Sequence, residues 1–142
     1  MMNHRLLFRA GTLAATLGIS ACFFGPKKIH LDASPDIPAA EAIAKISSTD
    51  NGNTKIELAV EHLALPSRVD PSATVYVVWV RDTGAGSRSQ NLGALRVDSD
   101  LKGNFTGVTP LRTFELFITA ERTQTTTDPS GRRLLYTNVG NR

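Results

Sequence analysis

Residues 74–80, with the sequence TVYVVWV, form the most apolar stretch of the chain and decide its fold. Four valines and two aromatic residues follow one another here, so both faces of an extended strand would be apolar. A short apolar run of this kind is typical of a strand that is covered on both faces. We therefore predict a central strand over these residues. We expect Trp79 on this strand to fill the core of the domain.

The segments on either side of this strand alternate between apolar and polar side chains. Residues 55–62 place Ile56, Leu58 and Val60 on one face, and charged side chains on the other. Such alternation predicts a strand with one wet face. Residues 113–121 alternate in the same way. The side chains expected inward are Phe114, Leu116, Ile118 and Ala120, and those expected outward are Thr113, Glu115, Phe117, Thr119 and Glu121.

Turn residues separate these strands from several shorter ones. An Asn-Gly pair within residues 49–53 predicts a hairpin between residues 41–47 and 55–62, because glycine reaches a positive φ at little cost. Further short strands are expected at residues 92–97, 105–108 and 134–139. About seven strands and no convincing helix predict an all-β fold, an antiparallel immunoglobulin-like β-sandwich over residues 41–142. The single cysteine excludes the disulfide-bearing version of that domain.

The N-terminus carries the features of a secretory signal. Residues 1–9 hold Arg5 and Arg9 and no acidic residue, and residues 10–19 are uncharged. A basic segment, a short apolar segment and small residues are the layout of a signal peptide. The apolar run is too short to span a bilayer, which takes about 20 residues. We predict a signal peptide over residues 1–21.

The four residues 19–22, ISAC, resemble the lipobox of bacterial lipoproteins. The resemblance implies cleavage between Ala21 and Cys22, with Cys22 as the lipidated first residue of the mature protein. A lone cysteine in an exported chain has no disulfide partner within the chain, which agrees with this use. The alternative is an ordinary secretory signal followed by a buried cysteine. Phe23 after the cysteine favours the outer membrane where the host has two membranes, and the choice between inner and outer membrane stays open.

Residues 22–40 are predicted to be the lipidated cysteine and an extended tether. They contain three prolines and no sustained periodicity, and proline-rich segments extend by roughly 3.1 Å per residue. Such a tether would hold the domain about 50 Å from the membrane. The alternative is that Ile29 and Leu31 already pair as an edge strand, and the sequence leaves this open.

Charge and composition exclude several classes of function. The chain carries 16 basic and 13 acidic residues, a formal net charge of +3, and two of the basic residues lie in the predicted signal peptide. No basic patch with interleaved aromatic residues is present, so a nucleic-acid partner is not expected. The lone cysteine also excludes a thiolate zinc site. We predict no cofactor and no metal.

Residues 74–139 resemble the extracytoplasmic C-terminal domain of anti-sigma factors of the regulator-of-sigma-K type. The resemblance rests on the motifs YVVW at residues 76–79, LGAL at 92–95, ITAE at 118–121 and PSG at 129–131, in that order and spacing. It implies a β-sandwich. Those proteins also carry a cytoplasmic region with metal-ligating Cys and His and a transmembrane helix, which this chain lacks. Inhibition of a sigma factor therefore does not carry over.

No motif in the chain predicts catalysis. His62 follows a strand near Glu61, but no nucleophile motif accompanies it, and it is interpreted as a strand-end histidine. Asp98 and Asp100 are interpreted as a polar turn, since a calcium loop needs more oxygen ligands. Glu121 is interpreted as a strand-end charge.

We therefore predict a lipid-anchored, extracytoplasmic β-sandwich with a binding or structural role in the cell envelope, and not an enzyme. Its partners would be the membrane, through Cys22, and an envelope protein. The loops at residues 81–91 and 122–131 are its predicted contact surfaces, because loops of sandwiches carry recognition. An envelope sensor related to anti-sigma ectodomains is the alternative function, and a hydrolase is the least favoured one.

Overall fold

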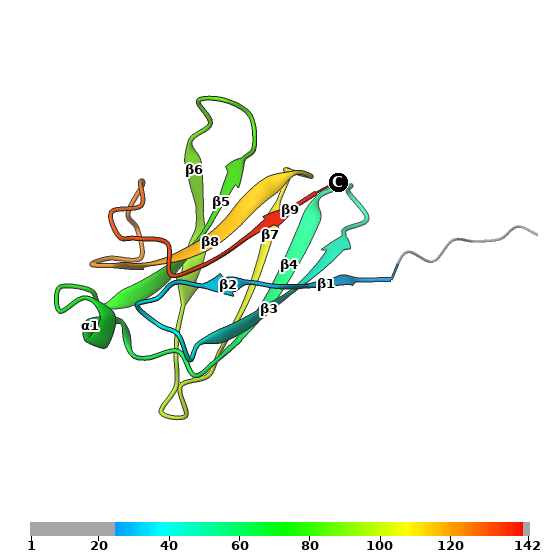
Figure 1. The fold of residues 1–142 in the computed structure, drawn as a ribbon. Helices are drawn as coiled ribbons and strands as arrows, with labels where there is room; N and C mark the ends of the chain where they lie inside the picture. The colour runs from blue at the N-terminus through cyan, green and yellow to red at the C-terminus, as the bar shows by residue number, and fades with distance from the viewer. Residues whose placement is uncertain (1–24, 141–142) are drawn as a thin grey trace, which may run out of the picture.

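The protein is a sandwich of two antiparallel β-sheets in a computed structural model that describes residues 25–140 (Figure 1). One sheet has four strands in the order β1-β3-β4-β7, with bounds β1 Lys27–His30, β3 Glu41–Ser48, β4 Thr54–Glu61 and β7 Gly103–Thr109. The other has five strands in the order β2-β9-β8-β5-β6, with bounds β2 Asp32–Ala33, β5 Val75–Asp82, β6 Ser89–Leu95, β8 Phe114–Glu121 and β9 Leu135–Val139. The predicted all-β antiparallel sandwich is confirmed.

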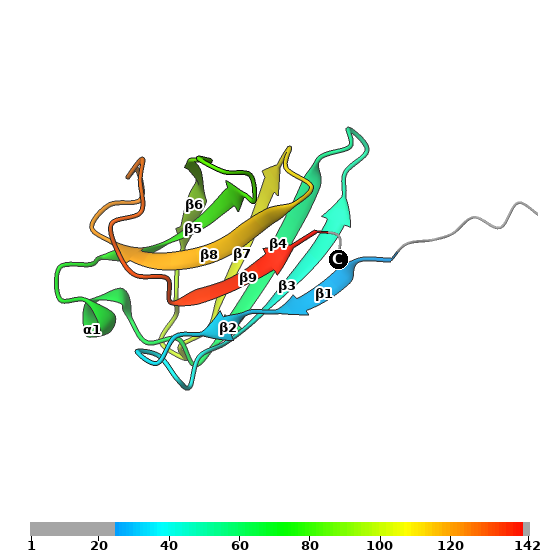
Figure 2. The same ribbon diagram turned by 45° about the horizontal axis from the view of Figure 1, so that its top comes forward.

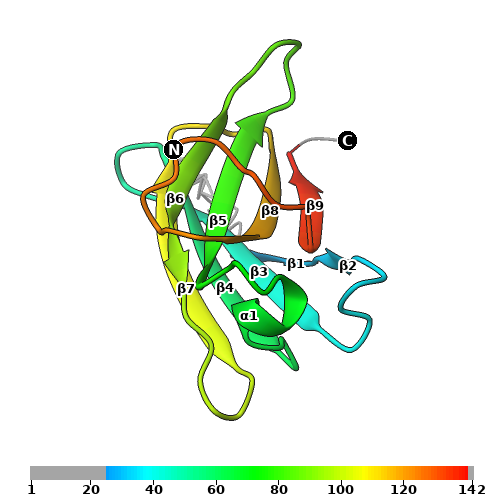
Figure 3. The ribbon, with the colours of Figure 1, turned by 90° about the vertical axis from the view of Figure 1, so that its left-hand side faces the viewer.

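The core lies between the two sheets, which face each other in Figures 2 and 3. Alternate side chains of β4 and β8 point into it, as their sequence pattern predicts. They are Ile56, Leu58, Val60, Phe114, Leu116, Ile118 and Ala120, and all are buried. From β5, Tyr76, Val78 and Val80 face the same core, and the phenolic hydroxyl of Tyr76 donates a hydrogen bond to the carbonyl oxygen of Ala64. The period of two along each strand therefore determines which residues meet between the sheets.

The predicted hairpin between β3 and β4 is present, with Gly52 at φ +78° in its turn. Thr49 closes this turn, because its hydroxyl oxygen accepts a hydrogen bond from the backbone N–H of Asn53. Between β4 and β5, Pro66–Val69 form the single-turn helix α1, where only a loop was expected. Proline at the start of α1 fits the first helical turn, where the missing N–H costs nothing.

The N-terminal segment belongs to the sandwich, so the prediction of a tether up to residue 40 is wrong for residues 27–40. Ile29 pairs with Ala44 in β3, and Ala33 pairs with Leu135 in β9. Leu31 lies between these two pairings and is buried in the core. The alternative that Ile29 and Leu31 belong to an edge strand is thus correct for β1, and the chain passes from one sheet to the other at Leu31. The apolar residues Ile29, Leu31 and Ile37 outweigh the prolines, because burying them stabilises the fold.

Substitution of Leu31 by alanine tests this arrangement. We expect Leu31→Ala to lower the free energy of unfolding by about 2–3 kcal/mol, because it leaves a cavity where the chain changes sheets. Thermal or urea denaturation measures the change. The exposed neighbour Lys28 gives the matched control, since Lys28→Ala should change stability by less than about 0.5 kcal/mol. An equally small effect of Leu31→Ala would show that residues 27–33 form a free tether.

One side of the sandwich is closed where β6 and β7 lie in contact. Gly103 permits this approach, because a Cβ at this position would lie 2.5 Å from the carbonyl oxygen of Arg96. Within β7, the ring of Phe105 lies against Gly107, where a Cβ would come within 3 Å of the ring. On the opposite side lie β1 and β9, which do not pair with each other among the described residues.

Trp79 does not lie in the core between the sheets, so that expectation is wrong. Val77, Trp79 and Phe117 form a separate buried cluster on the outer face of the five-stranded sheet. The rings of Trp79 and Phe117 stack with centroids 6.4 Å apart. Because both faces of residues 74–80 are apolar, the sequence alone does not distinguish the inner face from the outer one. The connection between β8 and β9 is hydrogen-bonded to this face of the sheet, which explains why an outward-facing tryptophan is fully buried.

Candidate functional site: a groove between two sheet edges

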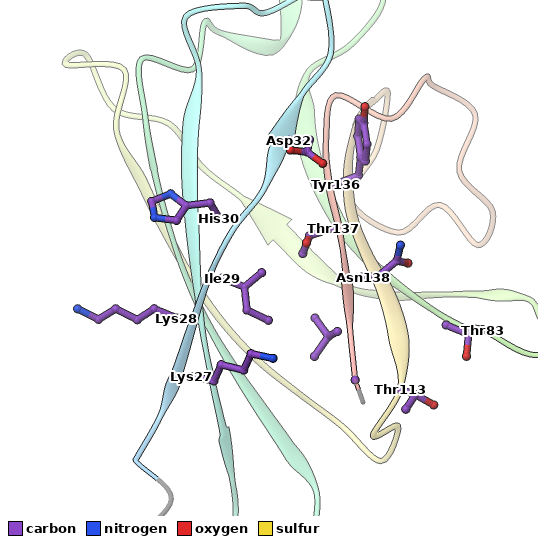
Figure 4. A pocket seen from close by; sticks show the side chains of 12 residues that line it. Lys27, Lys28, Ile29, His30, Asp32, Thr83, Thr113, Tyr136, Thr137 and Asn138 are labelled. Carbon is purple, nitrogen blue, oxygen red and sulfur yellow. The ribbon is translucent and has the colours of Figure 1, made fainter. Parts of the chain in front are cut away.

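A groove of about 980 Å³ runs between β1 and β9, the edges of the two sheets on the open side (Figure 4). It forms because β2 covers β9 only at Leu135 and Tyr136, so among the described residues no strand lies beside residues 137–139 on the side away from β8. β1 meanwhile pairs only with β3. The volume is at the upper end of the range for ligand pockets, about 300–1,000 Å³. Two incomplete sheet edges therefore border this hollow.

Peptide groups that have no backbone partner among the described residues line both walls of the groove. The N–H of Leu31 donates to Ala42 in β3, and peptide groups of a strand point alternately to its two sides. The backbone groups of Lys28 and His30 therefore face the groove. On the other wall, the carbonyl of Leu134 accepts from Ser34 next to β2, so two and four residues further on, Tyr136 and Asn138 face the same side. The edge at Asn138 lies beyond the end of β2.

Side chains give the groove an apolar floor and a basic mouth. Ile29 and Val139 pack against the core, and Lys27 extends toward β9, whereas Lys28 and His30 point away from it (Figure 4). Neither lysine takes part in an ion pair among residues 25–140. Asp32 also lines the groove, at the end where β2 begins. Among residues 25–140, the site offers a ligand backbone donors and acceptors, the Lys27 ammonium group inside the groove and the Lys28 ammonium group on its outer side.

A second group of polar side chains fastens the connection between β8 and β9 to the sheet. The indole N–H of Trp79 donates to the hydroxyl of Thr119 at 2.9 Å, and that hydroxyl donates to Glu121 at 2.6 Å. The Glu121 carboxylate also accepts hydrogen bonds from the hydroxyl and backbone N–H of Ser130 and from the N–H of Gly131. The buried carboxylate of Glu121 therefore accepts hydrogen bonds from four donors.

These hydrogen bonds set the charge state of Glu121. Burial alone would raise the pKa of the carboxyl group. The hydrogen bonds from Ser130, Thr119 and Gly131 outweigh burial and hold the pKa below its ordinary value. Glu121 is thus an ionised structural group, and the interpretation of it as a strand-end charge missed its burial. Its hydrogen-bond partners lie on the same strand and nine to ten residues further on, and no periodicity signals that approach.

An ion-pair cluster covers the other side of Phe117. The carboxylate of Glu115 contacts the guanidinium groups of Arg81 and Arg133, each at 2.5 Å. Both guanidinium groups lie over the ring of Phe117, with Arg133 at 5.3 Å and Arg81 at 6.0 Å from its centroid. Phe117, which was expected on the outward face, is therefore covered by side chains of the chain itself.

The predicted contact loops differ in their availability. The segment at residues 122–131 is held by Glu121 and by the side-chain amide of Asn91, which donates to the carbonyls of Gln124 and Thr126. Residues 81–91 comprise the ends of β5 and β6 and a short hairpin loop between them. The groove between β1 and β9 was not predicted from the sequence.

The remaining predicted residues are placed as follows. Ala21 and Cys22 lie outside the described residues. His62 is exposed at φ +55°, and Asp98 closes a turn by accepting from the N–H groups of Asp100 and Lys102. Within residues 25–140, no group of three or more His, Cys, Asp or Glu side chains is placed to hold a metal ion, and no helix is long and apolar enough to cross a membrane.

The comparisons with known protein families and with curated proteins found no match. The resemblance of residues 74–139 to anti-sigma ectodomains accordingly stays a prediction from short motifs.

Proposed function

We propose that this protein is a non-enzymatic binding module of the cell envelope, held on the extracytoplasmic side of a membrane by a lipid on Cys22. The observation that carries the binding role is the groove between β1 and β9. It presents unpaired backbone groups at Lys28, His30 and Asn138 beside an apolar floor. Backbone hydrogen bonds and an apolar surface are sufficient to bind a partner, and they require no catalytic side chains.

The start of β1 at Lys27 strengthens the connection between anchor and groove. Lys27 is five residues after Cys22, and a chain of that length reaches at most about 18 Å. This is much less than the roughly 50 Å of a tether ending at residue 40. A lipid on Cys22 would therefore keep the groove close to the membrane surface.

The anchor is tested by Cys22→Ala in the full chain. We expect the wild-type protein to incorporate labelled palmitate and to fractionate with membranes. The variant should lose the label completely, since only a thiol forms the thioether, and the matched change Ser20→Ala should keep it because the site stays small. Incorporation of palmitate by Cys22→Ala would contradict the anchor.

The binding role is tested separately by site-specific photocrosslinking in intact cells. A photoreactive residue in place of Thr137, which lines the groove, should give a defined crosslinked product. The same residue in place of Thr106, exposed on the outer face of the other sheet, is the control and should give none. Equal products from both positions, or products from neither, would contradict binding in the groove.

A further inference from the structure

We propose that the groove between β1 and β9 binds an extended, acidic peptide segment of another envelope protein by strand addition to β9. The inference rests on the proposed binding role of this groove and names the class of its partner. The segment would pair with the free edge at Asn138. Its carboxylates would lie against Lys27 within the groove and Lys28 on the rim.

Strand addition follows from the position of the free edge. β9 is hydrogen-bonded to β8 along its whole length, but β2 covers only its first two residues. The peptide group of Asn138 therefore continues a row of donors and acceptors that β2 leaves unfinished. An extended peptide completes such a row with main-chain hydrogen bonds, whereas a helix cannot, because its own peptide groups are already paired.

The position of β1, the second wall of the groove, leaves the edge of β9 at Asn138 open to a segment of another protein. β1 precedes Leu31 and pairs with β3 through Lys27–His30, whereas the chain reaches β9 only after Leu31, as β2. The chain's own N-terminal segment therefore occupies the five-stranded sheet only at β2. The space left between β1 and β9 is bordered by strand edges on both sides, and its floor of Ile29 and Val139 would receive an apolar side chain.

The positive charges of Lys27 and Lys28 favour an acidic segment over a neutral or basic one. Lys27 and Lys28 are exposed, and neither has a carboxylate partner among the described residues. In contrast, Lys45 and Lys55 on the same sheet both contact Glu57. Cations without partners attract a segment that brings carboxylates, and like charges would be repelled. An alternation of acidic and apolar side chains matches the mouth and the floor together.

The test uses the unlipidated chain from residue 23 onward, which keeps both sheets because every strand lies within residues 27–139. The probe is an octapeptide that alternates Val and Glu. We expect exchange of the Asn138 amide proton with solvent to slow at least tenfold at saturating peptide. A peptide with Lys for Glu, and one with a central proline, should each bind at least tenfold more weakly, because proline removes a main-chain donor.

Charge reversal in the protein completes the test. Lys27→Glu/Lys28→Glu should weaken binding of the Val-Glu peptide at least tenfold. The control Arg68→Glu/Arg96→Glu changes the net charge equally at exposed positions away from the groove, and should keep the affinity within twofold. Equal binding of the proline peptide, unchanged exchange at Asn138, or a dimer joined through β9 that the peptide does not displace would overturn the proposal. Because this chain carries no lipid, such a failure leaves the Cys22 anchor standing, and failure of the anchor leaves the groove untouched.

Discussion

Replacement of Trp79 by alanine is expected to lower the free energy of unfolding by about 3–5 kcal/mol. The side chain is fully buried, stacks on Phe117 and donates a hydrogen bond to Thr119. Its removal leaves a cavity on the outer face of the sheet, and the Thr119 hydroxyl keeps its bond to Glu121 but loses the donor from which it accepts. Small domains have about 5–15 kcal/mol of stability in total, so this single change would remove a large part of it.

Denaturation in urea measures this loss, and limited trypsin digestion locates it. We expect earlier cleavage after Arg122 and Arg132 in Trp79→Ala than in the wild type, because the connection between β8 and β9 loses the surface on which it packs. Trp79→Phe is the matched control, since it keeps an aromatic ring and loses mainly the hydrogen bond, which is worth about 1 kcal/mol. A loss below about 1 kcal/mol in Trp79→Ala would show that the outer cluster contributes little to stability.

The second large effect is expected at Glu121. Glu121→Ala leaves the hydroxyls of Thr119 and Ser130 and two backbone N–H groups without their acceptor. We expect a loss of about 2–3 kcal/mol, because hydrogen bonds to charged groups are stronger than neutral ones. Glu57→Ala is the control. Glu57 makes two ion pairs with Lys45 and Lys55 on a half-exposed surface, and such pairs contribute about 0–1 kcal/mol.

The same carboxylate gives stability a defined dependence on pH. The pKa of Glu121 is lower in the folded protein than the ordinary value of about 4.3 in the unfolded chain. The unfolded state therefore binds more protons in this range. The contribution of Glu121 is complete above about pH 4.3, and it is lost as the pH falls through the lower folded value. Glu121→Gln should flatten this part of the stability curve, and an unchanged acid dependence would contradict the assignment.

The strand pattern and the layers were predictable from the sequence because they depend on local alternation. The inward residues of β8 and the Asn-Gly turn before β4 are confirmed. Trp79 was placed on the wrong face, because residues 74–80 are apolar on both sides and nothing local distinguishes them. The prolines near β2 predicted a tether, whereas Ile29 and Leu31 are held by residues that follow later in the chain.

The candidate groove could not be predicted, since it depends on where strands end relative to one another. Its walls are peptide groups of Lys28 and Asn138, and their side chains carry no signal of a free backbone edge. The interpretation of Glu121 as a strand-end charge likewise missed its burial, because its partner Ser130 approaches through a loop. Periodicity identifies the faces of a strand, but the neighbours of an edge depend on the complete fold.

The pairing of Ala33 with Leu135 has a consequence for the order of folding. These residues are about a hundred positions apart, and contacts between such distant residues form slowly, because a long loop must close first. A chain is synthesised from its N-terminus, so β1 and β2 appear long before β9, the strand with which β2 pairs. Leu31 consequently lacks part of its final packing until the last strand has been synthesised. During that interval the earliest part of the domain is its most aggregation-prone part.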